Sequence, residues 1–265
     1  MNNVQIANET LRIIKEKQYE YKGEKVSLPD MDYSNVTVYS PEKGAQLVDE
    51  RTDTDGDMCR IILTTEDSFE AASRYNDAMV MNFANAHNPG GGFRLGATAQ
   101  EEALCRCSTL YESINSKKAS EMYKYNNSHI SQVESDYMLF SRVCVFRNKK
   151  CELLEEPFNT YVITIPAPNR IGAAMLASDK LINETMIRRI RIMLMIAKEN
   201  GCKNLVLGSW GCGAFRNKPG DVASCFKKVI VEEGYGKYFD EICFAIYGNE
   251  DGKNYTEFKK VLGKI

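Results

Sequence analysis

The sequence predicts a layered α/β fold in which helices cover a central β-sheet, and two observations carry this prediction. First, four short apolar runs have the length and composition of strands that are buried on both faces of a sheet. These runs are AMVMNFAN (78–85), YVITIPAP (161–168), NLVLGSWG (204–211) and EICFAIYG (241–248). Second, the strongly amphipathic segment 180–199 predicts a helix that ends at Gly201, between the second and third runs. Buried strands that alternate with helices are typical of α/β sheets that bind ligands at the strand ends.

Shorter elements precede these runs. Residues 6–17 predict a helix that turns Ile6, Ile13 and Ile14 inward, and EKVSL (24–28) and NVTVYS (35–40) alternate like strands. The segment RIILTTEDSFEAASRYN (60–76) predicts a strand and then a helix that is capped near Thr65 or Asp67.

Composition limits the class of protein and the kinds of partner. A chain of 265 residues with 43% hydrophobic content suits one large domain or two small ones. No run approaches the length of a transmembrane helix, and the N-terminus lacks the apolar block of a signal peptide. The nine cysteines form no CxxC pair, so we expect a cytoplasmic protein with reduced thiols. Two histidines and a net charge of -2 argue against a metal centre and against general attraction to nucleic acid.

Two glycine-rich loops follow two of the apolar runs. They are NPGGGFRLG (88–96) and GSWGCGAF (208–215), and the exposed N–H groups of such loops form anion-binding concavities. The first loop has P-loop spacing, but Ala97 stands where the phosphate-binding lysine belongs, and Arg216 spoils a G-x-G-x-x-G match in the second. Two tight turns are the structural alternative, but two such loops after buried strands favour a phosphate cradle.

Adjacent carboxylates follow the first loop. Residues 100–112 predict one helix, and Thr98 with Glu101 forms a T-x-x-E capping box, which accounts for Glu101 but not for Gln100 or Glu102. Successive helix positions point about 100° apart, so the two glutamates cannot have the same role. A carboxylic acid that protonates a leaving oxygen is the central device of glycoside cleavage. Spacing alone leaves capping and catalysis equally open.

A family resemblance joins these features. GGGFRLGATAQEE (90–102) resembles the GGG-x(6–8)-QEE signature of poly(ADP-ribose) glycohydrolases. The segments VMNFANAHNPGGG, LFSRVCVFRN, ITIPAPN and LVLGSWGCGAFRNKPGDVA, in that order, resemble the bacterial-type branch, which is built on a macrodomain. The resemblance implies a three-layer α/β/α macrodomain-like core with a mixed central sheet at residues 60–265. It also implies that residues 1–59 form a helical and strand extension packed on this core.

The resemblance also implies roles for individual residues. Glu102 would be the catalytic acid that protonates the leaving ribose oxygen at a ribose–ribose bond, and Glu101 would position the scissile ribose. The implied substrate-binding residues are Asn85, Gly90, Gly91, Gly92, Gln100, Gly208, Ser209, Gly211, Cys212, Gly213, Ala214 and Phe215. No metal or cofactor is implied. The expected ligands are ADP-ribose and poly(ADP-ribose) or ADP-ribosylated protein, with no nucleic acid or membrane partner, and we expect a monomer.

Two other functions stay open from the sequence. One is an ADP-ribose reader without catalysis, although a reader has no need of Glu102. The other is a different hydrolase, which removes single ADP-ribose units from protein or deacylates an acetylated ADP-ribose. Trp210 is equally compatible with the pocket and the core. Cys105, Cys107 and Cys212 lack a histidine partner at a recognisable spacing, which favours packing over nucleophilic roles.

Overall fold

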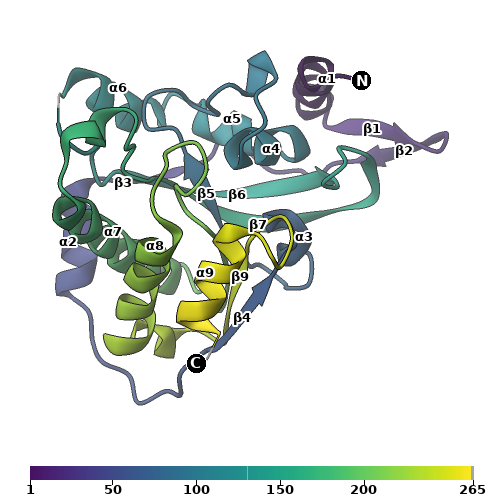
Figure 1. Cartoon of the computed structure of the whole chain (residues 1–265). Helices are drawn as coiled ribbons and strands as arrows, with labels where there is room; N and C mark the ends of the chain where they lie inside the picture. Colours follow the sequence, from purple (N-terminus) through teal and green to yellow (C-terminus); the bar gives the residue numbers. More distant parts are fainter. Residues whose placement is uncertain (130, 264–265) are drawn as a thin grey trace.

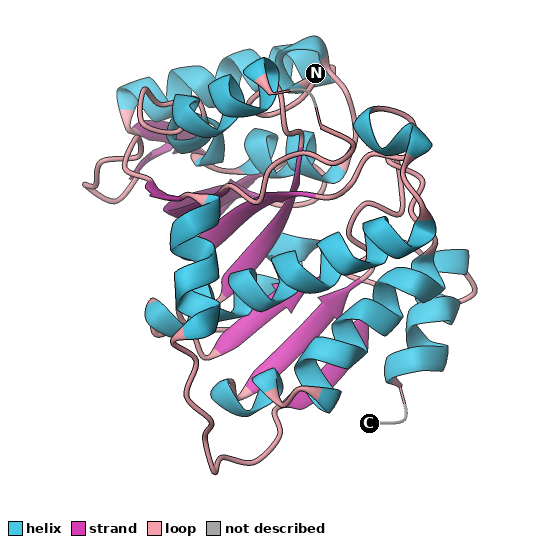
Figure 2. Cartoon of the chain, turned by 90° about the vertical axis from the view of Figure 1, so that its left-hand side faces the viewer, coloured by secondary structure: helices cyan, strands magenta, loops and turns pink. Residues whose placement is uncertain are grey.

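A mixed seven-stranded sheet lies between two layers of helices in the computed structural model, which describes residues 1–129 and 131–263 (Figures 1 and 2). Its strands are β3 (Thr37–Tyr39), β4 (Arg60–Thr64), β5 (Met79–Ala84), β6 (Met138–Arg147), β7 (Leu153–Pro166), β8 (Asn204–Leu207) and β9 (Glu241–Ala245). The strand order is β3-β6-β7-β5-β8-β9-β4. Neighbours from β7 to β4 run parallel, whereas β6 is antiparallel to both β7 and β3.

Helices cover both faces of this sheet, as Figure 1 shows. They are α1 (Asn3–Glu16), α2 (Pro41–Asp49), α3 (Ser68–Ala72), α4 (Gln100–Cys107), α5 (Leu110–Ile114), α6 (Ser120–Ser128), α7 (Asp179–Glu199), α8 (Pro219–Lys227) and α9 (Lys253–Leu262). Met79 and Met81 of β5 pack with α7, α8 and α9, whereas Val80 packs with α3 to α6 on the other face. The predicted three-layer fold with a mixed sheet is confirmed.

The four apolar runs are strands as predicted. Those at β5, β8 and β9 are almost wholly buried, because helices lie on both faces and leave neither side exposed to water. The run at 161–168 covers only the end of the long strand β7, which forms a hairpin with β6 along nearly all of its length. The amphipathic segment forms α7, and Gly201 follows it in the left-handed region with φ +71°.

The N-terminal elements also form where the sequence places them. Helix α1 buries Ile6, Ile13 and Ile14, and the two-stranded hairpin of β1 (Gln18–Tyr21) and β2 (Glu24–Ser27) packs beside it. The hydroxyl of Thr10 in α1 donates to the Arg106 carbonyl at 2.7 Å, which ties this segment to α4. Strand β3 joins the central sheet itself. The division of the chain at residue 59 stays a prediction.

The single helix predicted over 100–112 is wrong, because the chain breaks after α4. Ser108 is fully extended and forms an isolated antiparallel bridge with Val145 of β6. The N–H of Thr109 donates to the Cys144 carbonyl, and its hydroxyl accepts from the Cys144 N–H, both at 3.0 Å. These hydrogen bonds compete with the helical ones, as Ser and Thr side chains commonly do.

The predicted capping box is also wrong. Helix α4 starts after Ala99, which gives no side-chain cap, so Thr98 is not the N-cap residue. The side chain of Glu101 turns into the protein interior instead, where it bonds with β5. The prediction at α3 is confirmed, since Asp67 caps that helix by accepting from the Glu70 N–H at 2.8 Å.

No helix in the part of the chain that the structure describes combines the length and the apolar character needed to cross a membrane.

We predict that Thr109→Val lowers the free energy of unfolding by about 1–3 kcal/mol, because it leaves the buried Cys144 N–H without an acceptor. The exposed Thr98 makes no such bond, so the control Thr98→Val should change stability by less than about 0.5 kcal/mol. Urea unfolding of both variants measures this difference, and equal losses would contradict the helix break.

Candidate active site

A cavity of about 1130 Å³ lies where β5 and β8 end. Residues from the loop after β5, the start of α4 and the loop after β8 line it together. Predicted site residues in its wall are Asn85, Gln100, Glu101, Glu102, Ser209, Gly211, Gly213, Ala214 and Phe215. The other predicted residues, Gly90, Gly91, Gly92, Gly208 and Cys212, belong to the two loops but are not part of the wall. The structure therefore brings together segments that lie more than a hundred residues apart.

The sheet opens at this point because β8 is short. It pairs with β5 only at Met79 and Val80, so the β8-facing edge of β5 beyond Val80 is left without a strand. The side chain of Gln100 takes the place of that strand. Its amide oxygen accepts from the Phe83 N–H at 2.9 Å, and its amide nitrogen donates to the Met81 carbonyl at 2.8 Å. Gln100 thus anchors the start of α4 to the sheet.

Glu101 continues the same arrangement just beyond the end of β5. It is only 3% exposed, and its Oε2 accepts from the Asn85 N–H at 2.8 Å. Its Oε1 accepts from Nδ2 of Asn82 at 3.2 Å. Asn82 also donates to the Thr164 hydroxyl at 3.1 Å, so this buried amide links the Glu101 carboxylate to β7.

Asn82 is a site residue that the sequence analysis missed. It is fully buried on β5, within a run that was interpreted as continuously apolar. The signal was present, because a buried polar side chain in an apolar strand must find hydrogen-bond partners. Its partners come from β7 and α4, however, and no local pattern identifies them.

Glu102 points in a different direction from Glu101 and holds the glycine loop. Its Oε1 accepts from the Gly92 N–H at 2.9 Å. Its Oε2 is buried, and no hydrogen-bond partner for it exists among residues 1–129 and 131–263. Glu102 lines the cavity and is 8% exposed, and Oε2 is the carboxylate oxygen that no other group of the described residues holds.

The close approach of Glu102 explains why glycines stand in the first loop. A Cβ added at Gly91 would lie 2.5 Å from Oε1 of Glu102, and the φ of Gly91 is +52°. One added at Gly90, where φ is +70°, would lie 2.8 Å from the Tyr111 ring. Both positions therefore require glycine, for its backbone freedom and for its lack of a side chain.

The second loop is held by a buried amide. Nδ2 of Asn217 donates to the carbonyls of Pro168 at 2.9 Å and Gly211 at 3.2 Å. Trp210 lies fully in the core and donates from Nε1 to the Ile165 carbonyl at 3.1 Å. Its role is therefore to fill the core and not to line the pocket. Phe215 is left half-buried at the cavity wall.

Burial controls the acidity of the site. Desolvation raises the pKa of Glu101 to about 8, against the opposing hydrogen bonds from Asn85 and Asn82, and the charge of Glu102 adds to the rise. The thiol of Cys105 is fully buried, and burial raises its pKa well above the ordinary value. Burial likewise raises the pKa of Cys212 to about 12, so packing roles suit these two cysteines.

No cluster of three His, Cys, Asp or Glu side chains that could hold a metal ion occurs within the described ranges, 1–129 and 131–263.

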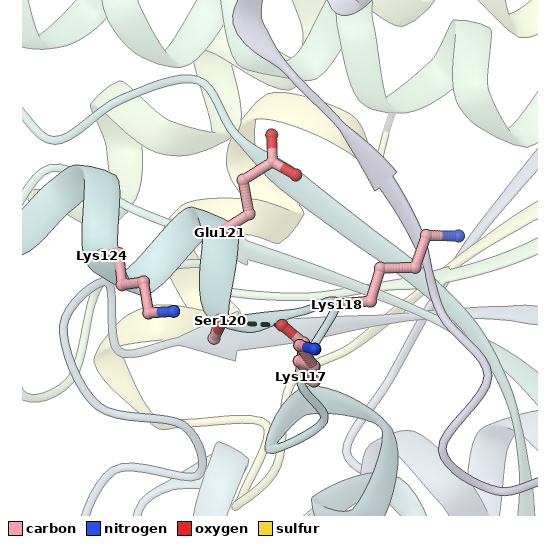
Figure 3. Close-up of a pocket in the computed structure, with 5 residues that line it drawn as sticks. All are labelled: Lys117, Lys118, Ser120, Glu121 and Lys124. Atoms are coloured by element: carbon pink, nitrogen blue, oxygen red, sulfur yellow. Dashed lines mark hydrogen bonds between the residues drawn. The ribbon is translucent and has the colours of Figure 1, made fainter.

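A second hollow, shown in Figure 3, lies on the surface at the start of α6. Its lining residues are Lys117, Lys118, Ser120, Glu121 and Lys124, of which the three lysines are exposed. The Ser120 hydroxyl donates to the Lys117 carbonyl at 2.7 Å, as in an ordinary helix start. Glu101 and Glu102 line the larger cavity and not this hollow.

Comparison with known proteins agrees with this geometry. The family model for the catalytic domain of microbial-type poly(ADP-ribose) glycohydrolase (PARG) matches residues 7–148. The PARG structure from Thermomonospora curvata is 33% identical, with a TM-score of 0.91, and the match covers 98% of this chain and 99% of that one.

Two similar structures contain ligands. PARG from Thermomonospora curvata bound to the inhibitor ADP-HPD is 32% identical, with a TM-score of 0.88 over 97% of this chain and 98% of that one. PARG from Deinococcus radiodurans in complex with ADP-ribose is 33% identical, with a TM-score of 0.81 over 90% of this chain and 99% of that one. No curated protein matches the chain.

We predict that Gly91→Ala lowers the free energy of unfolding by about 1–3 kcal/mol, because alanine is strained at this φ and its methyl group displaces Glu102. Gly213→Ala in the second loop is the matched control. A Cβ there meets nothing within 4 Å, so stability should change by less than about 0.5 kcal/mol. Thermal or urea unfolding measures both, and a neutral Gly91→Ala would show that the loop does not need this close approach.

Glu101 should also make stability depend on pH. Its pKa is raised from 4.5 to about 8, so between these values the folded chain holds a proton that the unfolded chain has lost. This contribution is fully present below pH 4.5 and disappears as the pH rises through about 8. We expect the free energy of unfolding to fall between about pH 5.5 and about pH 8.5, and part of this fall to be absent in Glu101→Gln. The exposed Glu112→Gln should keep the whole fall, and an unchanged slope in Glu101→Gln would contradict the buried proton.

Proposed function

The chain belongs to the microbial-type poly(ADP-ribose) glycohydrolase family, and from this membership we propose that it hydrolyses the ribose–ribose O-glycosidic bonds of poly(ADP-ribose) and releases ADP-ribose. The observation that supports this activity in this chain is the buried Oε2 of Glu102. Glu102 lines the cavity, and this oxygen has no hydrogen-bond partner among the described residues, so no other protein group competes with a leaving oxygen for it.

In the proposed reaction, Glu102 is the general acid. Its carboxyl group gives a proton to the ribose oxygen that leaves, while the bond from that oxygen to the anomeric carbon breaks. The positive charge that develops at the anomeric carbon is shared with the ring oxygen. Water then adds to this carbon and returns a proton to Glu102, so the acid is regenerated. The Gly92 N–H fixes Oε1 and leaves Oε2 for this transfer.

Glu101 is the positioning residue in this proposal. Its oxygens already accept from Asn85 and Asn82, and each keeps a second lone pair for a ribose hydroxyl. Its buried hydrogen bonds hold the end of β5 and the start of α4 in register. Gln100 contributes in the same way, through its hydrogen bonds to Phe83 and Met81 of β5.

We further propose that the two loops bind the diphosphate through backbone N–H groups. Gly90, Gly91 and Gly92 form the first side of this cradle. The second loop forms the other side with Gly208, Ser209, Gly211, Cys212, Gly213 and Ala214, and Phe215 and Asn85 contact the ribose next to the scissile bond. The relatives bound to ADP-ribose and to ADP-HPD support a ligand of this class in the cavity. A cytoplasmic location, a monomeric state and the lack of a cofactor stay predictions.

Glu102→Gln tests the acid. We expect the variant to release ADP-ribose from polymer about 10²–10⁴-fold more slowly than the unmodified protein, because the amide cannot donate the proton. Glutamine keeps the size of the side chain and an oxygen for the Gly92 N–H, so ADP-ribose binding measured by calorimetry should persist.

The same assay separates the alternatives. Tight ADP-ribose binding without release by the unmodified protein would indicate a reader instead of an enzyme. Release from singly ADP-ribosylated protein or deacylation of acetylated ADP-ribose, with polymer untouched, would indicate a different hydrolase. Equal rates for both forms on polymer would remove Glu102 from the acid role.

A further inference from the structure

Two cysteines from different elements meet at the C-terminal end of α4. The Cys107 thiol donates to the Asn148 carbonyl at 3.4 Å, and the Cys151 N–H donates to the same oxygen at 2.8 Å. The two side chains are close enough that each is the largest influence on the pKa of the other. Cys107 is buried, Cys151 is partly exposed in the turn between β6 and β7, and both line the same cavity as the glutamates.

Two arginines, Arg106 and Arg147, act on this pair. Arg106 is buried and has no carboxylate within salt-bridge distance in the described part of the chain; its Nη1 donates to the Ala97 carbonyl at 2.6 Å. Its Nε has no partner there either. Arg147 donates from Nη1 to the Cys151 carbonyl at 2.7 Å and pairs with Glu9 of α1. A buried guanidinium without a carboxylate needs another anion nearby.

An acidic thiol at Cys151 can supply the anion that the Arg106 guanidinium needs. The neighbouring Cys107 side chain lowers the pKa of Cys151 to about 6, and the guanidinium groups of Arg106 and Arg147 add to the effect against desolvation. The neighbouring Cys151 side chain and burial raise the pKa of Cys107 well above its ordinary value, and the charge of Asp67 adds to the rise. Lys150 and Glu152 flank Cys151 in the turn and line the cavity with it. These effects favour the thiolate at Cys151 and the protonated thiol at Cys107.

The backbone at Cys151 is unusual as well. Its φ of +61° lies in the left-handed region, where glycine or asparagine is the less strained choice. A cysteine at such a position gives the turn no conformational advantage.

We propose that Cys151 is a nucleophilic thiolate that hydrogen peroxide oxidises, and that Cys107 is the resolving thiol that closes a disulfide with it. In the first step the Cys151 sulfur attacks one peroxide oxygen, the O–O bond breaks, and the hydroxide that leaves takes up a proton to give water. In the second step the Cys107 sulfur attacks the resulting sulfenic acid, and the S–O bond breaks. The oxygen leaves as a second water, which includes the Cys107 proton. Two thiols lose two electrons, and peroxide gains them.

Alkylation measures the first part of this proposal. At pH 7 we expect limiting iodoacetamide to modify Cys151 at least about tenfold faster than Cys212, because an ordinary thiol is mostly protonated there. Cys212 is the matched internal control, since it is also partly exposed and its pKa is raised to about 12. Peptide mapping of the partly alkylated protein gives both rates. Equal rates at the two positions would overturn the proposal.

Peroxide treatment measures the second part. We expect the intact protein to lose the mass of two hydrogen atoms, peptide mapping to find Cys107 linked to Cys151, and dithiothreitol to reverse the change. In Cys107→Ser the reaction should stop at a sulfenic acid on Cys151, which dimedone traps, and Cys151→Ser should form neither product. Peptides that stay unlinked in the unmodified protein, or a disulfide elsewhere, would overturn the proposal. Because no step uses the hydrolytic activity, the outcome is independent of the proposed function.

Discussion

The site depends on the way in which the central sheet opens between β5 and β8. Strand β8 pairs with β5 at only two residues, so polar backbone groups at Met81, Phe83 and Asn85 face an interior without a strand to bond them. A buried backbone group without a partner costs about 1–3 kcal/mol. The side chains of Gln100 and Glu101 form hydrogen bonds with these backbone groups. They can do so only if α4 begins beside the open edge of β5. The same opening that creates the cavity therefore fixes the helix that carries the carboxylates.

The positions of the two glutamates follow from this anchoring. With Gln100 and Glu101 bonded to β5, the next residue on the helix must turn towards the first glycine loop, where Glu102 accepts from the Gly92 N–H. Gly91 lies so close to that carboxylate that a side chain at this position would displace it. The GGG and QEE segments are thus in contact with each other, and the residues between them form the loop that allows this contact.

Helix α4 carries different chemistry at its two ends. Its first turn holds the carboxylates, and its last two residues, Arg106 and Cys107, meet the β6–β7 turn with Cys151. The helix is short because Ser108 and Thr109 bond with β6, and this places both ends in the wall of one cavity. A carboxyl group made less acidic by burial then lies at one end of α4, and at the other end Cys107 and the arginines make the Cys151 thiol more acidic.

The sequence by itself determined the layered fold, most strand and helix positions, and the glutamate and glycine segments that identify the family. It could do so because burial on two faces leaves a continuous apolar run, and because the signature is contiguous along the chain. Only the tertiary structure decided the bonding of each polar group. Glu101 caps nothing, Trp210 fills the core, Asn82 supports the site and Cys107 meets Cys151. The reason is that a hydrogen-bond partner on another element of the fold, as Ile165 is for Trp210 at 45 positions away, leaves no local periodicity to detect.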